Sequence, residues 1–219
     1  MRPLPVALAA AAVLVVAGTA AGARDPRLER LALRPPDTSF ARSALIRAAD
    51  LGTGWTLRKA QVDESSPPDC KGQDYSAFTI TGQSQTQFDQ AGRTVLSRVE
   101  LYRSHKQALG DFAVDDRPGT ASCEGNAIRR DVARSARGVT VKLLSAKRLA
   151  DPRVGQRSIA LRIVLGISNT QSNIRLYVDL VGFVRDRAIG SVLVVAPGRP
   201  LEGATKLAQT IESRLQRVA

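Results

Sequence analysis

The chain has 219 residues and is strongly basic, with 32 lysine and arginine residues against 20 aspartate and glutamate residues. This length fits one domain that can bury an ordinary hydrophobic core. The formal charge of +12 permits anionic partners, among them phospholipid head groups and phosphate-rich wall polymers. Aromatic residues make up only 4% of the chain, and the basic residues are dispersed. Both features argue against nucleic acid, which requires clustered phosphate contacts and stacking platforms.

The first 23 residues have the pattern of a secretory signal peptide. A positive start at Arg2 precedes an apolar run over residues 4–17, and Ala21-Gly22-Ala23 offers a cleavage site. The run is shorter than the ~20 residues that a membrane-spanning helix needs. We therefore expect cleavage after Ala23, which removes one positive charge, and an exported protein in an oxidising compartment.

Residues 24–37 are polar, rich in arginine and end in a double proline, so we expect a flexible lead-in. The remaining residues, 38–219, form a single predicted domain without an internal linker. Asp37 or Thr38 is expected to cap a short first helix. The segment from Ala49 to Thr56 then turns the chain into a first strand, with Trp55 as a core or rim anchor.

A long antiparallel hairpin is predicted over residues 76–88 and 94–102, because apolar residues alternate with polar ones in both segments. The alternation places Phe78, Ile80 and Phe88 on one side of the first strand. Two helices are expected to follow this hairpin, with Ser104 and Thr120 as their N-caps. The pair Asp115-Asp116 is interpreted as the end of the first of these helices, rather than as a catalytic pair.

Cys70 and Cys123 are the only cysteines, and they lie at the two ends of this strand and helix region. In an exported protein we predict that they form a disulfide; the alternative is two separate reduced thiols. In the chain-entropy model, closing such a loop stabilises the fold by about 4 kcal/mol, less any native strain.

Four more strands are predicted in the second half, over residues 139–146, 158–167, 173–185 and 188–196. A C-terminal helix follows, with an apolar stripe that includes Leu207, Ile211 and Leu215. Short connections between consecutive strands favour antiparallel pairing. The predicted fold class is therefore α+β: a twisted, mostly antiparallel sheet of about six to seven strands with helices mainly on one face.

Sequence motifs for catalysis are weak. The single histidine, His105, stands at the start of a predicted helix, and no nucleophile motif of the G-x-S-x-G type is present. A single histidine and two cysteines that are expected to be oxidised do not suit a zinc site. We therefore predict a protein that is not an enzyme and has no catalytic residue, metal or cofactor.

The predicted strands also carry a set of polar and aromatic residues on the alternate parity. Tyr102, Arg162, Tyr177 and Asp179 are candidates to line a ligand groove on this second face of the sheet. The alternative is a solvated face with cross-strand ion pairs.

Several phrases resemble a known family. They are Ala49-Asp50-Leu51-Gly52 with Gly54-Trp55, the hairpin end Ser97-Arg98-Val99-Glu100-Leu101-Tyr102, a helix with Cys123, and Leu207-Ala208-Gln209-Thr210-Ile211. Over roughly residues 38–216 the chain is similar to small exported actinobacterial proteins and to the extracellular sensor domain of PknH-type receptor serine/threonine kinases. The resemblance implies a non-enzymatic α+β domain that binds a ligand in a cleft. The chain departs from this family in one respect. It has one predicted disulfide, whereas the sensor domain of the kinase is expected to have two.

Together these patterns predict an exported, monomeric, sensor-like domain of the cell envelope that binds a small or lipidic ligand. Two other functions stay open. One is a basic structural protein on anionic cell wall or lipid, and the other is an unrecognised hydrolase.

Overall fold

The computed structural model describes residues 25–58, 70, 72–136 and 138–216. The signal peptide predicted at residues 1–23, with its cleavage after Ala23, lies outside these residues. In chain order the elements are β1 Arg30–Leu31, α1 Pro35–Ala44, α2 Ala48–Leu51, β2 Thr56–Arg58, β3 Thr79–Gln90, β4 Arg93–Tyr102, α3 His105–Asp115, α4 Thr120–Ser135, β5 Thr140–Arg148, β6 Arg157–Ser168, β7 Asn173–Arg185, β8 Ala188–Pro197 and α5 Ala204–Gln216. Of the helices in the described ranges, none is long and apolar enough to cross a bilayer.

The described strands form one eight-stranded sheet in the order β1-β3-β4-β8-β7-β6-β5, with β2 also paired to β3. Every pairing is antiparallel except the short parallel contact between β1 and β3. The hairpin, the four later strands and the C-terminal helix lie where the alternation of apolar residues predicts them. The α+β class is confirmed.

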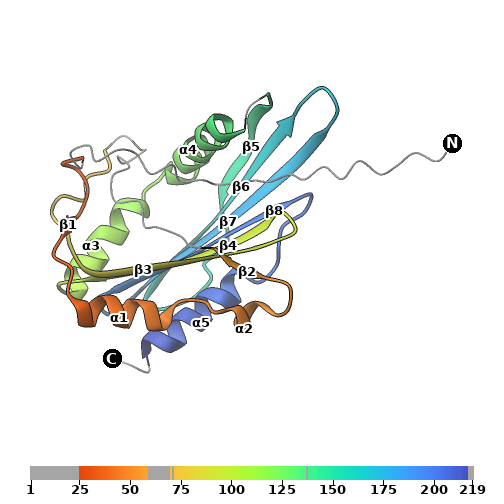
Figure 1. Ribbon diagram of the computed structural model, residues 1–219. Coiled ribbons are helices and arrows are strands. Elements are labelled where there is room, and N and C mark those ends of the chain that lie inside the picture. Colours follow the sequence, from red (N-terminus) through yellow and green to blue (C-terminus); the bar gives the residue numbers. More distant parts are fainter. Residues whose placement is uncertain (1–24, 59–69, 71, 137, 217–219) are drawn as a thin grey trace.

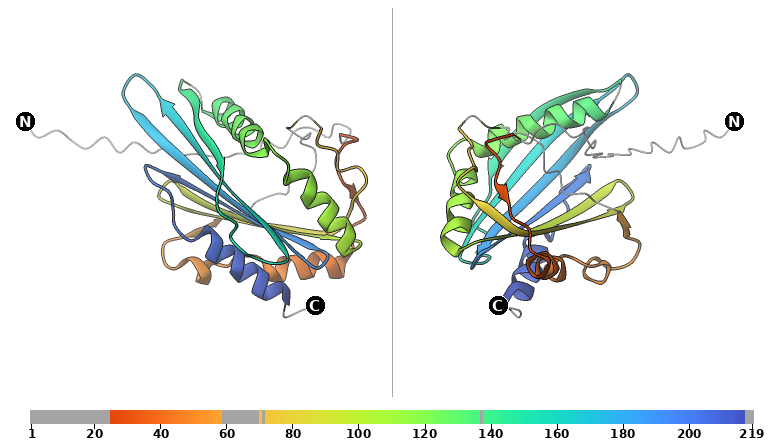
Figure 2. Two further views of the ribbon diagram at one scale, coloured as in Figure 1. Left: turned by 180° about the vertical axis from the view of Figure 1, so that it is seen from behind. Right: turned by 60° about the vertical axis from the view of Figure 1, so that its left-hand side comes forward.

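The helices cover both faces of this sheet rather than mainly one (Figures 1 and 2). Helices α1 and α5 pack on one face, where Leu45 and Ile211 join Phe183 in the largest cluster of the core. Helices α3 and α4 lie on the opposite face, where Phe112 and Val132 belong to two smaller clusters. The inner strands β7 and β8 carry apolar side chains on both parities, so both of their faces require cover.

The segment expected to be a flexible lead-in contributes two elements instead. Arg30 and Leu31 pair with Thr79 and Ile80, and α1 starts at Pro35 rather than at a cap near Thr38. Proline suits the first turn of a helix, because its fixed φ is already helical and the missing N–H has no partner there.

A bulge in β3 changes which face its side chains reach. The register with β4 shifts between Ile80 and Gly82. Ile80 therefore packs under α3, whereas Phe88 packs in the α1 and α5 core, so the prediction that they share a side was wrong. An extra residue inverts the alternation beyond it, and an apolar pattern does not reveal that position.

Of the two helix caps predicted after the hairpin, one is confirmed. The Ser104 side chain accepts a hydrogen bond from the Gln107 backbone N–H at 3.3 Å and so caps α3, which ends at Asp115 as expected. Thr120 is the first residue of α4 rather than its cap. Gly119 precedes it in the left-handed region at φ 90°, which glycine adopts at little cost.

Candidate functional site

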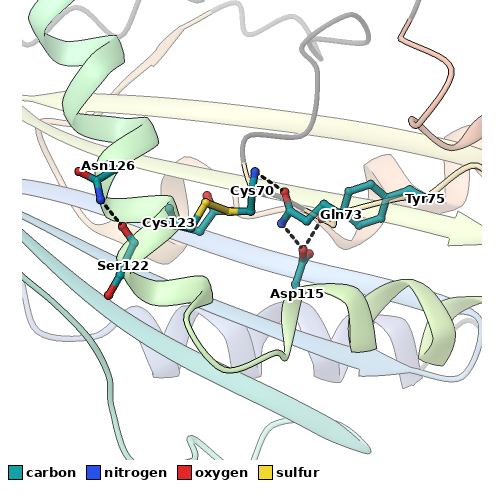
Figure 3. The surroundings of a disulfide bond; sticks show 8 residues. Cys70, Gln73, Tyr75, Asp115, Ser122, Cys123 and Asn126 are labelled. Carbon is teal, nitrogen blue, oxygen red and sulfur yellow. Dashed lines mark hydrogen bonds between the residues drawn. A yellow bond between two sulfur atoms is a disulfide. The ribbon is translucent and has the colours of Figure 1, made fainter.

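The predicted disulfide is present in the structure and ties the segment before β3 to α4. Cys70 and Cys123 are joined with their Cα atoms 5.7 Å apart, 53 residues apart in sequence (Figure 3). The bond fixes the start of a short irregular segment, residues 72–78, which runs past the C-terminal end of α3. The side chains of this segment are therefore held against that helix.

Asp115, in the last turn of α3, receives two hydrogen bonds from this segment. Gln73 Nε2 donates to its carboxylate at 3.2 Å, and the Tyr75 hydroxyl donates to the same oxygen (Figure 3). Gln73 in turn accepts the Cys70 backbone N–H at 3.0 Å. Burial raises the pKa of Asp115, while the bonds from Tyr75 and Gln73 oppose that rise. This network is fully paired and connects the disulfide to α3.

The four residues predicted to line one groove lie on two different faces of the sheet. Tyr102 is on the face that α3 covers, opposite Ile80 in the β3–β4 register. Arg162 pairs with Asp179 across β6 and β7, and Asp179 is opposite Val194, which belongs to the α1 and α5 core. Tyr177 shares the parity of Asp179. The predicted set therefore cannot form a single site.

Arg162 and Asp179 instead bind one another. The guanidinium donates from Nε to Oδ1 at 2.6 Å and from Nη2 to Oδ2 at 2.8 Å, while the Asp179 side chain is 8% exposed. The bond to Asp179 raises the pKa of Arg162 further. This bidentate pair satisfies both groups, and it matches the cross-strand ion pair that the sequence left as an alternative.

Beneath α3 the structure gathers a different set of polar residues, which we call the Tyr102 cluster: Arg98, Glu100 and Tyr102 of β4 and Asp111 of α3. Tyr102 is fully buried and Asp111 is 4% exposed. Among the described residues, four buried side-chain atoms lack a hydrogen-bond partner, and three of them belong to this cluster: Arg98 Nε, the Tyr102 hydroxyl oxygen and Asp111 Oδ2. Native proteins rarely leave such groups unpaired, because each costs about 1–3 kcal/mol.

Electrostatics keep Asp111 protonated at neutral pH. Burial, aided by the nearby carboxylates of Glu100, Glu29 and Asp115, raises the pKa of Asp111 to about 9. Burial likewise raises the pKa of Tyr102 well above its usual range. The Tyr102 hydroxyl is near the Asp111 carboxyl and partly offsets the rise in the pKa of Asp111. The hydroxyl nevertheless makes no hydrogen bond to Asp111 Oδ2. Both groups therefore carry a proton that they can donate.

The three unpartnered groups share one property, which is that each can donate a hydrogen bond. A guanidinium N–H, a phenol O–H and a neutral carboxylic acid O–H are all hydrogen-bond donors. Glu100 accepts from Arg98 and keeps the local charge close to balanced. Such a group of donors suits a ligand with acceptor oxygens that carries no net negative charge, since carboxylates already surround Asp111.

The cluster is connected to the surface along β4. Exposure rises from zero at Tyr102 to 14% for the Glu100 side chain and 30% for that of Arg98. Ile189, which is opposite Glu100 in the β4–β8 register, is only partly buried and packs against the same core cluster as Tyr102. A ligand that reaches the donors along this strand would therefore meet an apolar side chain as well.

Sequence reasoning missed Asp111 because nothing marks it locally. It is one of several acidic residues on or near α3, and its burial follows from its helical spacing with Ala108 and Phe112. The two apolar residues point that side of the helix toward the sheet, so a polar residue between them was a detectable sign.

His105 lies where the sequence places it, exposed at the start of α3. Its Nδ1 is 2.7 Å from the Asp186 carbonyl oxygen at the β7–β8 turn. In the part of the chain that the structure describes, no three His, Cys, Asp or Glu side chains are grouped so that they could hold a metal ion.

The comparisons with known proteins bear on the fold. No protein-family model matches the sequence, and neither does any curated protein. Among solved structures, the extracellular domain of PknH from Mycobacterium tuberculosis is similar at a TM-score of 0.54 and 12% identity. The match covers 84% of this chain and 98% of that domain. The chain therefore shares the α+β fold of that extracellular domain.

Proposed function

We propose that this protein is an extracytoplasmic, sensor-like domain that binds a small neutral molecule at the Tyr102 cluster and performs no catalysis on it. The observation that carries the proposal is the gathering of three unpartnered donors, two of them on side chains at least nine-tenths buried, in one place. Support also comes from the likeness of the fold to the extracellular domain of PknH and from the signal-peptide pattern at residues 1–23.

The chemistry of the cluster defines the class of ligand. The ligand carries acceptor oxygens, such as carbonyl or hydroxyl oxygens, that accept hydrogen bonds from Arg98, Tyr102 and Asp111. The ligand also carries an apolar part that packs on Ile189, which is opposite Glu100 in the β4–β8 register. A small glycosylated or acylated molecule meets both conditions.

Native mass spectrometry of the protein purified from its own host tests the proposal. We expect the parent to retain a bound small molecule, and Tyr102→Phe, which removes only one hydroxyl, to lower its occupancy by roughly tenfold. Tyr177→Phe is the matched control on the opposite face and should retain the ligand. Loss in Tyr177→Phe with retention in Tyr102→Phe would contradict the proposal, as would the absence of a bound mass from all three proteins.

A further inference from the structure

One part of the sheet has a helix on only one of its faces, as far as the described residues show. On the face that α1 and α5 cover, α1 packs on β3 and β4, and α5 packs on β7 and β8. Helix α4 contacts β5 and β6 from the other side. In the described part of the chain, the outer strands β5 and β6, with the adjoining end of β7, therefore have no helix on the α5 side, where they extend beyond α5 (Figures 1 and 2).

The register shows which side chains this area presents. Lys147, Arg162 and Asp179 form one row across the three strands, and Lys142, Gly166 and Arg175 form another. Between them Val164 is opposite both Ser145 and Tyr177. We call this area the β5–β7 basic face: Lys142, Leu144 and Lys147 of β5, Val164 of β6, and Arg175 and Tyr177 of β7.

Charge on this face is positive and unneutralised. Lys142, Lys147 and Arg175 are all exposed, and the described residues hold no ion-pair partner for any of them. The one acidic residue in these rows, Asp179, is buried in its bidentate pair with Arg162. Two copies of the chain would therefore repel each other across this face, and an anionic partner would be attracted.

Apolar atoms occupy the centre of the same face. A bulge between Leu143 and Ser145 adds Leu144 to β5, and its side chain is over Gly166 at 51% exposure. Val164 and Tyr177 beside it are partly buried. Lysines and a bulge are common protection for an edge strand such as β5. That explanation does not extend to Arg175, which is on the inner strand β7, or to an exposed leucine.

We propose that the β5–β7 basic face docks on an anionic lipid bilayer. The face is part of a sheet and has a glycine, Gly166, at its centre. It therefore presents an extended surface that can contact the extended surface of a bilayer. Each lysine or arginine close to an anionic membrane contributes about 1 kcal/mol of attraction, and Leu144 and Tyr177 supply the apolar and amphipathic contacts typical of an interface. This docking is separate from the Tyr102 cluster, which lies on the opposite face.

Sedimentation with lipid vesicles tests this docking. The vesicles contain either phosphatidylcholine alone or equal parts of phosphatidylcholine and phosphatidylglycerol. All proteins are prepared identically, so that the apolar run at residues 4–17 contributes equally. We expect the parent to bind the anionic vesicles more tightly, with an affinity that falls as salt rises. The double variant Lys142→Glu, Arg175→Glu should bind them at least about tenfold more weakly.

The matched control is Arg103→Glu with Lys106→Glu, at the start of α3 on the opposite face, which makes the same change in net charge. It should bind within about twofold of the parent, and Leu144→Ser should weaken binding without changing its salt dependence. Equal losses in the two double variants would overturn the proposal. So would a parent that is retained on immobilised inorganic polyphosphate but does not sediment with anionic vesicles, because the face would then recognise a polymer. Circular dichroism verifies that each variant is folded.

Discussion

Two buried aspartates on opposite faces of the sheet have opposite surroundings. Asp179 is held by two hydrogen bonds from Arg162, whereas Asp111 has an oxygen without a partner and a pKa raised to about 9, mainly by burial. A buried carboxylate that is paired has a structural role, because the adjacent guanidinium neutralises its charge. A carboxylic acid that is buried and unpaired costs stability, so its retention points to a use. The comparison separates a structural pair from a candidate binding site.

The largest expected effect is on the disulfide that holds residues 72–78 against α3. Cys70→Ser with Cys123→Ser should lower the free energy of unfolding by about 4 kcal/mol, because the unfolded chain loses a cross-link. Chemical denaturation with and without reductant measures it. If reduction leaves the parent as stable as the oxidised form, the disulfide contributes nothing to the fold.

Breaking the Arg162–Asp179 pair should have the next largest effect. Arg162→Met leaves Asp179 buried and unpaired, and we expect a loss of about 2–3 kcal/mol, below the range for fully buried pairs because Arg162 is 30% exposed. Asp111→Asn, at the unpaired acid on the other face, is the comparison. Because the folded protein holds Asp111 in its neutral form, this substitution should cost no stability at pH 7. Equal losses in urea denaturation would show that the two aspartates do not differ in this way.

The dependence of stability on pH should carry the signature of Asp111. Its folded pKa, about 9, is above the ordinary value of 3.8, so the native state binds the extra proton between these limits. Its contribution to stability is therefore full below about pH 4 and is lost as pH rises toward 9, by at most about 1.4 kcal/mol per pH unit. Asp111→Asn should remove this part of the slope. Parallel profiles for parent and variant, from denaturation at pH 5 to 9, would contradict it.

The smallest expected effect distinguishes two buried tyrosines. Tyr75→Phe removes a hydroxyl that donates to Asp115 and should cost about 1 kcal/mol. Tyr102→Phe removes a hydroxyl without a partner and should be neutral or slightly stabilising. Thermal melts of the two variants side by side measure the difference. A larger loss for Tyr102→Phe would mean that its hydroxyl is paired in solution.

Alternation and helical spacing in the sequence predicted the α+β class, the hairpin, the four later strands and α5. They succeeded because a strand or helix with one buried side repeats its apolar residues at the period of its own backbone. The pairing of Cys70 with Cys123 also followed from the sequence, since two cysteines in an exported chain leave one disulfide to form.

The tertiary structure alone decided which polar residues meet. Tyr102 and Asp179 both stand in strands with clear alternation, yet the register of the three neighbouring strands β4, β8 and β7 assigns them to opposite faces, and no local pattern contains that register. The bulge at Ile80 and the helices on both faces were likewise settled by packing. Asp111 became a candidate binding residue only when α3 was placed on β4, because its burial and its unpaired oxygen are properties of that contact and not of the helix itself.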